Sequence, residues 1–171
     1  MQRPADNDYG SWYANYVSLV PEEDVLSVIE QQSSTTQRLI SSLDESQAMH
    51  RYAEGKWSVK EVIGHVTDAE RVFGYRALCI ARGDQNSLPG FDEQEYMKHA
   101  NFDSWRLGDL AEAYALTRRA NIVMFRNMDD ASWDRRGLAN NSEVTVRALA
   151  FILAGHERHH LKVLRERYLV G

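Results

Sequence analysis

Residues 144–168 read VTVRALAFILAGHERHHLKVLRERY and contain three of the chain's six histidines within five positions. Apolar residues recur here at the period of a helix, and Leu149, Ile152 and Val163 share one stripe. At about 100° per residue, His156 and His160 differ by about 40° around the helix and lie one turn apart on that stripe. We therefore expect both imidazoles to face the core, where a shared metal ion would satisfy their ring nitrogens.

Three further amphipathic segments precede this one. Pro21 followed by acidic residues predicts the start of a first helix. Ser58 and Glu61 have the spacing of a capping box and predict the start of a second, and Ser104 predicts the start of a third, with Arg118 off its apolar face. The expected helices span about 21–43, 58–83, 104–128 and 144–168. Because no strand pattern is evident, the sequence predicts an all-α four-helix bundle.

Two segments lie outside these helices. Residues 84–103 are rich in turn formers and form a long connection, either a lid or binding loop or a plain surface excursion. Residues 1–20 carry Tyr9, Trp12, Tyr13 and Tyr16, which we expect to pack across the bundle or between two chains.

Composition restricts the class of protein. A chain of 171 residues with 43% hydrophobic and 26% charged residues predicts a single domain over 1–171. The net charge of −5 disfavours nucleic-acid binding. Cys79 is the one cysteine, so no intramolecular disulfide can form, and no apolar run is long enough to span a membrane. We expect a cytoplasmic protein without a membrane anchor.

A third metal ligand would have to come from another helix. His65 is the best candidate because it lies mid-helix in the second segment, whereas His50 and His99 fall in connections. Glycine precedes both His65 and His156, which makes room for a ligand or for close helix packing. Three neutral imidazoles leave metal positions open, as in catalytic sites, whereas structural zinc is normally closed by four protein ligands.

Other interpretations fit parts of the pattern. An inward histidine is often a hydrogen-bonded core residue, which needs no metal. HERHH also matches the HExxH motif of zinc peptidases, with Glu157 as general base, but residues 161–171 contain no histidine and leave no room for a downstream helix carrying a glutamate ligand. A ferritin-like di-iron centre would need two Glu-x-x-His units, and only Glu157 to His160 fits.

Four segments together resemble the DinB-like superfamily of damage-inducible and related bacterial proteins. They are WSVKEVIGHVTDAE (57–70), YRALCIARGD (75–84), LPGFDEQEY (88–96) and TVRALAFILAGHERHHLKVLRERY (145–168). The resemblance implies an up-down-down-up four-helix bundle with a metal triad at His65, His156 and His160. It also implies a divalent ion such as zinc, nickel or iron, a homodimer, and either hydrolysis or transfer to a low-molecular-weight thiol.

Several polar residues are weaker candidates for the site. Glu61 and Asp68 lie one turn on either side of His65, where they would accept a hydrogen bond from its imidazole or simply be solvated. Arg71 and Arg76 are candidates to bind a substrate carboxylate at the pocket rim. Glu157 is expected at the periphery and is a candidate proton acceptor.

The sequence thus predicts a metal-dependent enzyme that acts on a small molecule by thiol S-transfer or hydrolysis. The alternative is a noncatalytic bundle that is stabilised by a metal or binds a ligand.

Overall fold

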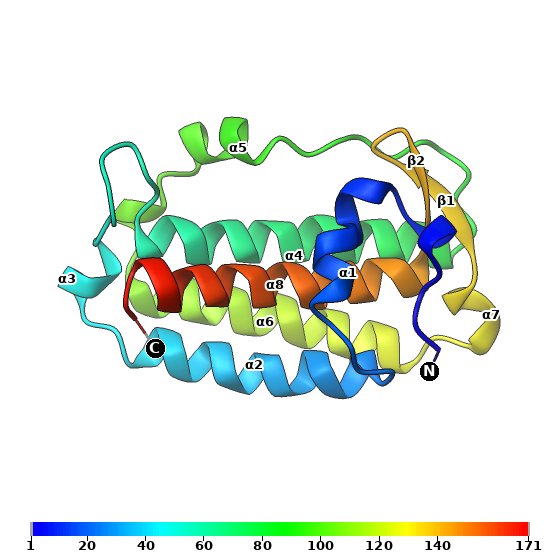
Figure 1. Ribbon diagram of the computed structural model, residues 1–171, viewed down its shortest axis with the longest axis horizontal. Helices are drawn as coiled ribbons and strands as arrows, with labels where there is room; N and C mark the ends of the chain where they lie inside the picture. The colour runs from blue at the N-terminus through cyan, green and yellow to red at the C-terminus, as the bar shows by residue number, and fades with distance from the viewer. Residues whose placement is uncertain (1, 171) are drawn as a thin grey trace.

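Four long helices form a bundle in the computed structural model, which describes residues 2–170. They are α2 (Val25–Ser41), α4 (Val59–Ala81), α6 (Leu107–Arg126) and α8 (Val146–Arg167). In Figure 1, α2 and α8 run in one direction and α4 and α6 in the other, so the order is up-down-down-up. Helix α4 packs against both α6 and α8, and α2 packs against the same two helices. The predicted fold class is confirmed.

Side-chain caps set the beginnings of three long helices. Ser58 caps α4 with a complete capping box through Glu61, as predicted, and Thr145 caps α8 by accepting a hydrogen bond from the Ala148 amide at 3.0 Å. The expected start at Pro21 is wrong, because the Asp24 carboxylate accepts from Ser27 N and caps α2 three residues later.

The third helix also begins later than expected. Residues 102–104 form a short 3₁₀ helix, and α6 follows from Leu107. Ser104 therefore does not cap α6: its hydroxyl donates back to the Asn101 carbonyl at 2.9 Å.

The connections contain elements that the sequence pattern did not reveal. Short helices are α1 (Ala14–Ser18), α3 (Glu45–Ala48), α5 (Glu93–Ala100) and α7 (Asp130–Trp133). The expectation of no strands is wrong, because β1 (Arg136–Ala139) and β2 (Ser142–Thr145) form an antiparallel hairpin. Asn140 and Asn141 both have positive φ, which is the backbone of a tight two-residue hairpin turn.

The bundle core has an apolar cluster toward each end and a polar layer between them. One cluster includes Ile29, Phe125 and Leu149, and the other includes Ile40 and Leu164. On α2, α6 and α8 the polar residues of the layer fall between the two clusters, and on α4 Glu70 lies where the second cluster gives way to the first. They are Gln32 and Thr36 on α2, Glu70 on α4, Arg118 on α6, and Glu157 on α8. The expectation that Arg118 lies off the buried face is wrong, because its side chain is 0% exposed and sits between carboxylates.

The N-terminal segment packs on the outside of α8. Helix α1 crosses α8 (Figure 1), and its Tyr16 carbonyl lies where a side chain on Gly155 would have to be. Gly155 therefore serves close helix packing, one of the two roles foreseen for it. Among residues 2–170, no helix combines the length and apolarity needed to cross a membrane.

Candidate metal centre

The three predicted histidines meet at the interface of α4 and α8. His65 is in the second turn of α4, and His156 and His160 occupy successive turns of α8. The capping box at Ser58 and the cap at Thr145 fix where each helix begins, and hence which residues face each other. Gly64 allows the Phe102 ring to pack directly against the backbone of α4 beside His65.

The Nε2 atoms of the triad converge. His65 Nε2 lies 3.0 Å from His156 Nε2, and His160 Nε2 lies 3.2 Å from the same atom. All three ligand atoms lie within 4.8 Å of one another. Two nitrogens bound to one tetrahedral zinc at about 2.0–2.1 Å are about 3.4 Å apart, so the spacing fits a shared ion as well as a hydrogen bond.

The triad is held in its neutral form. Burial lowers the pKa of His65 to about 4, and the neighbouring His159 adds to the shift. Burial also lowers the pKa values of His156 and His160 well below the ordinary value, with further lowering by the other histidines. Because a metal ion binds the unprotonated ring nitrogen, these imidazoles are ready to coordinate at neutral pH. The donor set therefore fits a divalent transition metal.

Aromatic side chains enclose the triad. Trp57 lies 5.0 Å from the His65 ring, and Phe91 stacks on the same imidazole at 6.1 Å between ring centroids. Tyr16 and Phe73 meet His156 edge-on at 5.3 and 5.8 Å. These rings fix the imidazole planes and keep water from the sides of the site.

All three histidines line one open cavity of about 430 Å³. Its other walls come from residues 12–16, the segment 91–94 before and within α5, and the hairpin turn. The lining residues are Trp12, Tyr13, Tyr16, Trp57, His65, Phe73, Arg76, Phe91, Glu93, Gln94, Asn140, His156, His159 and His160. A small molecule in this cavity would touch the triad on the side that protein does not cover.

Of the four supporting residues expected near the triad, the structure brings one to the cavity. Arg76 lines its wall, whereas Arg71 pairs with Asp68 at 2.8 Å on the outer face of α4. Glu61 is used in the capping box and pairs with Arg51 at 2.5 Å. Neither Glu61 nor Asp68 hydrogen-bonds a ligand imidazole in the described part of the chain.

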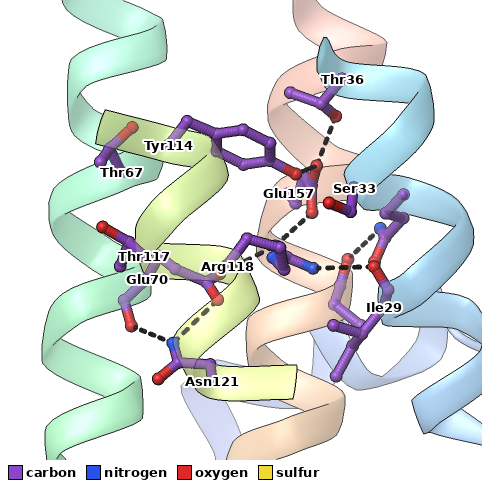
Figure 2. A network of polar contacts seen from close by, with 12 residues as sticks. Ile29, Ser33, Thr36, Thr67, Glu70, Tyr114, Thr117, Arg118, Asn121 and Glu157 are labelled. Carbon is purple, nitrogen blue, oxygen red and sulfur yellow. Dashed lines mark hydrogen bonds and ion pairs between the residues drawn. The ribbon is translucent and has the colours of Figure 1, made fainter. Parts of the chain in front are cut away.

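Glu157 lies in the core, so the expectation of a peripheral position is wrong (Figure 2). Its carboxylate accepts hydrogen bonds from the Thr36 hydroxyl and from the Tyr114 hydroxyl, the latter at 2.6 Å, and pairs with Arg118. It is next in sequence to His156 but does not line the histidine cavity. The HExxH arrangement, with the glutamate facing the metal, is therefore not formed.

Several cavity residues were missed by sequence reasoning. Tyr16, Glu93 and Asn140 reach the site from α1, α5 and the hairpin turn, far from α4 and α8 in sequence. Tyr16 had a sequence signal, because the aromatic residues of the N-terminus predict packing across the bundle or between two chains. The short α5 gave none, since no residue of it is buried.

The sequence is similar to one family model and to two named relatives. A family model described as the DinB superfamily matches residues 29–164. The protein named "Putative metal-dependent hydrolase OB0413" from Oceanobacillus iheyensis is 24% identical over 150 residues, covering 83% of this chain and 86% of the relative. "Putative metal-dependent hydrolase BH0277" from Halalkalibacterium halodurans is 28% identical over 166 residues, covering 94% and 96%.

Solved structures share the fold at low identity. YfiT from Bacillus subtilis, described as "a probable metal-dependent hydrolase with an unusual four-helix bundle topology", matches with a TM-score of 0.75 and 14% identity, over 99% of this chain and 94% of that one. A mycothiol-dependent maleylpyruvate isomerase matches with a TM-score of 0.68 and 15% identity, over 85% of this chain and 61% of that one.

Proposed function

The chain belongs to the DinB superfamily, and from this membership and its converging histidine triad we propose that it is a metal-dependent enzyme. We propose that His65, His156 and His160 bind one divalent ion. The observation that carries the proposal is the convergence of three neutral Nε2 donors in the wall of an open cavity. Zinc, nickel and iron all suit such donors, and the ligand set does not select among them.

The proposed reaction is hydrolysis of a small molecule. A bound ion would supply Lewis acidity and bring the pKa of a water ligand close to neutrality. The chain's own part is to hold three neutral imidazoles and to surround the substrate with aromatic walls. The curated relatives that carry hydrolase names support this reaction over others.

Thiol S-transfer is the second candidate. The structural neighbour that depends on mycothiol favours it, because the same open position would accept a thiolate in place of water. The two reactions differ in one requirement: hydrolysis proceeds without an added thiol, and S-transfer does not.

A noncatalytic, metal-stabilised bundle is the competing class. It predicts a closed site with four protein ligands. Within residues 2–170, the group of candidate ligands around this point contains only the three histidines. This arrangement favours an ion with free positions that face the cavity.

Metal content is the first test. We expect elemental analysis of untagged, zinc-reconstituted protein to give about one metal per chain, and His65→Ala and His156→Ala to lose it. His99→Ala is the matched control, because His99 lies on α5 outside the cavity and should keep the metal. A metal-free wild type, or retention in both triad variants, would overturn the proposal.

Activity is the second test. The loaded protein is screened against small esters and amides, with and without a low-molecular-weight thiol. Turnover that needs the triad and no thiol supports hydrolysis, and turnover only with thiol supports S-transfer. A folded, metal-loaded protein that turns over neither panel favours the noncatalytic alternative. A cytoplasmic location, a homodimer, and a lack of nucleic-acid or membrane partners remain predictions from the sequence.

A further inference from the structure

Arg76 is a buried cation in the wall of the histidine cavity. It lies on α4 and is 3% exposed. One guanidinium nitrogen donates to the Tyr13 hydroxyl at 3.3 Å, and another donates to the Pro89 carbonyl at 2.8 Å. Its guanidinium carbon lies 5.8 Å from the centroid of the Phe73 ring. These contacts hold the head group in place without neutralising it.

Arg76 differs from Arg118, the other buried arginine, in the partners of its guanidinium group. Arg118 forms ion pairs with both Glu70 and Glu157. Arg76 forms no ion pair with any carboxylate in residues 2–170, and its partners are a hydroxyl, a carbonyl and a ring. Buried charges are normally paired, because a buried charge without a partner loses its hydration free energy and gains no electrostatic stabilisation in exchange. Arg76 lines the histidine cavity and also a second cavity of about 310 Å³ that it shares with Arg71. A counter-ion would enter from one of these two, and only the histidine cavity also contains the triad.

The guanidinium retains the capacity to bind an anion. It has five N–H donors, and the two bonds to Tyr13 and Pro89 use two of them. A carboxylate can accept two of the remaining donors side by side, which is the strongest form of such a contact. Tyr13 and Pro89 fix the plane of the head group, so little freedom is lost on binding.

The rest of the cavity indicates what the anion is attached to. Six aromatic residues line it: Trp12, Tyr13, Tyr16, Trp57, Phe73 and Phe91. Such walls fit a flat or apolar body. Glu93 is the one carboxylate among the lining residues, and it disfavours a second negative charge on the ligand.

We propose that Arg76 is the anion-binding residue of this site and that the substrate is a small monocarboxylate with an aromatic or apolar body. The proposal rests on the proposed function, because it places the carboxylate on Arg76 and the reacting group at the triad. Arg76 thereby sets both the class of substrate and its orientation in the cavity.

The test is a binding titration of zinc-reconstituted, full-length protein with phenylacetate and with its neutral analogue phenylacetamide. Indole N–H signals in NMR spectra report binding: Trp12 and Trp57 line the cavity, and Trp105 and Trp133 do not. A charge-assisted hydrogen-bonded contact predicts binding of the acid about 10- to 100-fold tighter than the amide. Shifts should appear at Trp12 and Trp57 and not at the other two.

Variants identify the residue responsible. Arg76→Gln should remove the preference for the acid, and Arg76→Lys should keep part of it because the charge remains. Arg71→Gln is the matched control, since Arg71 lies on the same helix and pairs with Asp68 outside the cavity. A preference that survives in Arg76→Gln would assign the anion to the metal ion and overturn the proposal.

The wild-type comparison stands even where a variant fails to fold. Equal affinity for acid and amide, or no binding of either, overturns the proposal. Zinc content measured on the same samples separates this result from failure of the metal site. One zinc per chain with equal affinities for acid and amide would overturn the Arg76 proposal and support the metal site. A preference for the acid in protein that binds no zinc would support the Arg76 proposal and overturn the metal site.

Discussion

Replacement of Arg118 by methionine should destabilise the protein more than any other single change in its polar layer. The guanidinium is 0% exposed and pairs with Glu70 at 2.8 Å and with Glu157 (Figure 2). These two carboxylates share one cation, so the cluster has one more negative than positive charge. Methionine fills much of the volume but leaves both carboxylates uncompensated in the core.

The magnitude follows from this charge count. Removal of one partner from a buried ion pair costs about 3–5 kcal/mol, and for a chain of this length that lowers Tm by about 6–20 °C. Glu157→Gln should cost less, about 1.5–3 kcal/mol, because it removes one contact to Arg118 but leaves the Arg118–Glu70 pair neutral overall. The side-chain carbonyl oxygen of this variant would still accept hydrogen bonds from Thr36 and Tyr114.

The double variant supplies the decisive comparison. Arg118→Met combined with Glu157→Gln removes one charge of each sign, so its cost should be at least about 1 kcal/mol smaller than the sum of the single costs. Urea unfolding in EDTA, followed by circular dichroism, gives the three free energies without a contribution from metal. Arg119→Met, at the exposed neighbouring position, is the control and should stay within about 0.5 kcal/mol of wild type. Strict additivity, or a loss below about 1 kcal/mol for Arg118→Met, would refute the charge argument.

Gly155→Ala should lower the free energy of unfolding in urea by about 1–3 kcal/mol, because the new methyl group would lie 1.9 Å from the Tyr16 carbonyl oxygen. Gly108→Ala is the control: it lies on open helix surface and should stabilise the protein by up to about 1 kcal/mol. The zinc affinity measured by calorimetry should change less than about threefold between pH 8 and pH 6. Burial lowers the pKa of His65 to about 4 and the pKa values of His156 and His160 well below the usual value, so all three stay unprotonated over this range. A site of three exposed histidines would lose about 70-fold in zinc affinity over the same range. Zinc at about 100 times its Kd should raise Tm by about 5–10 °C, and a His156→Ala protein that shows the same rise would contradict binding at the triad.

The parts of the fold that follow local rules could be predicted from the sequence. The capping box at Ser58 and the stripe on residues 144–168 placed α4 and α8 correctly within a few residues. The hairpin was missed because its strands are four residues each, too short for an alternating pattern to stand out. Pro21 was a misleading start signal, since Asp24 competes as the capping residue and wins through its bond to Ser27.

Some residues of the site could also be predicted from the sequence, and others could not. The i, i+4 pair and His65 could be selected because one helix face is readable from spacing alone. Arg118 was misplaced because the rule that charged residues face solvent does not foresee two carboxylates from other helices that meet it in the core. Tyr16 and Glu93 depend on how the N-terminus and α5 fold back over the bundle, which is a tertiary event that no local pattern encodes.

One turn of α8 is held from three directions, and this packing fixes the position of His156. Successive helix positions differ by about 100°, so Gly155, His156 and Glu157 face different neighbours. Gly155 meets α1, His156 meets α4 and the cavity, and Glu157 is bonded to α2 and α6. A rotation of α8 that moved the imidazole would break the polar layer and push Tyr16 away at the same time. Metal binding should therefore leave α8 in place, and adjustment to substrates should fall to α5, which has no buried residue to anchor it.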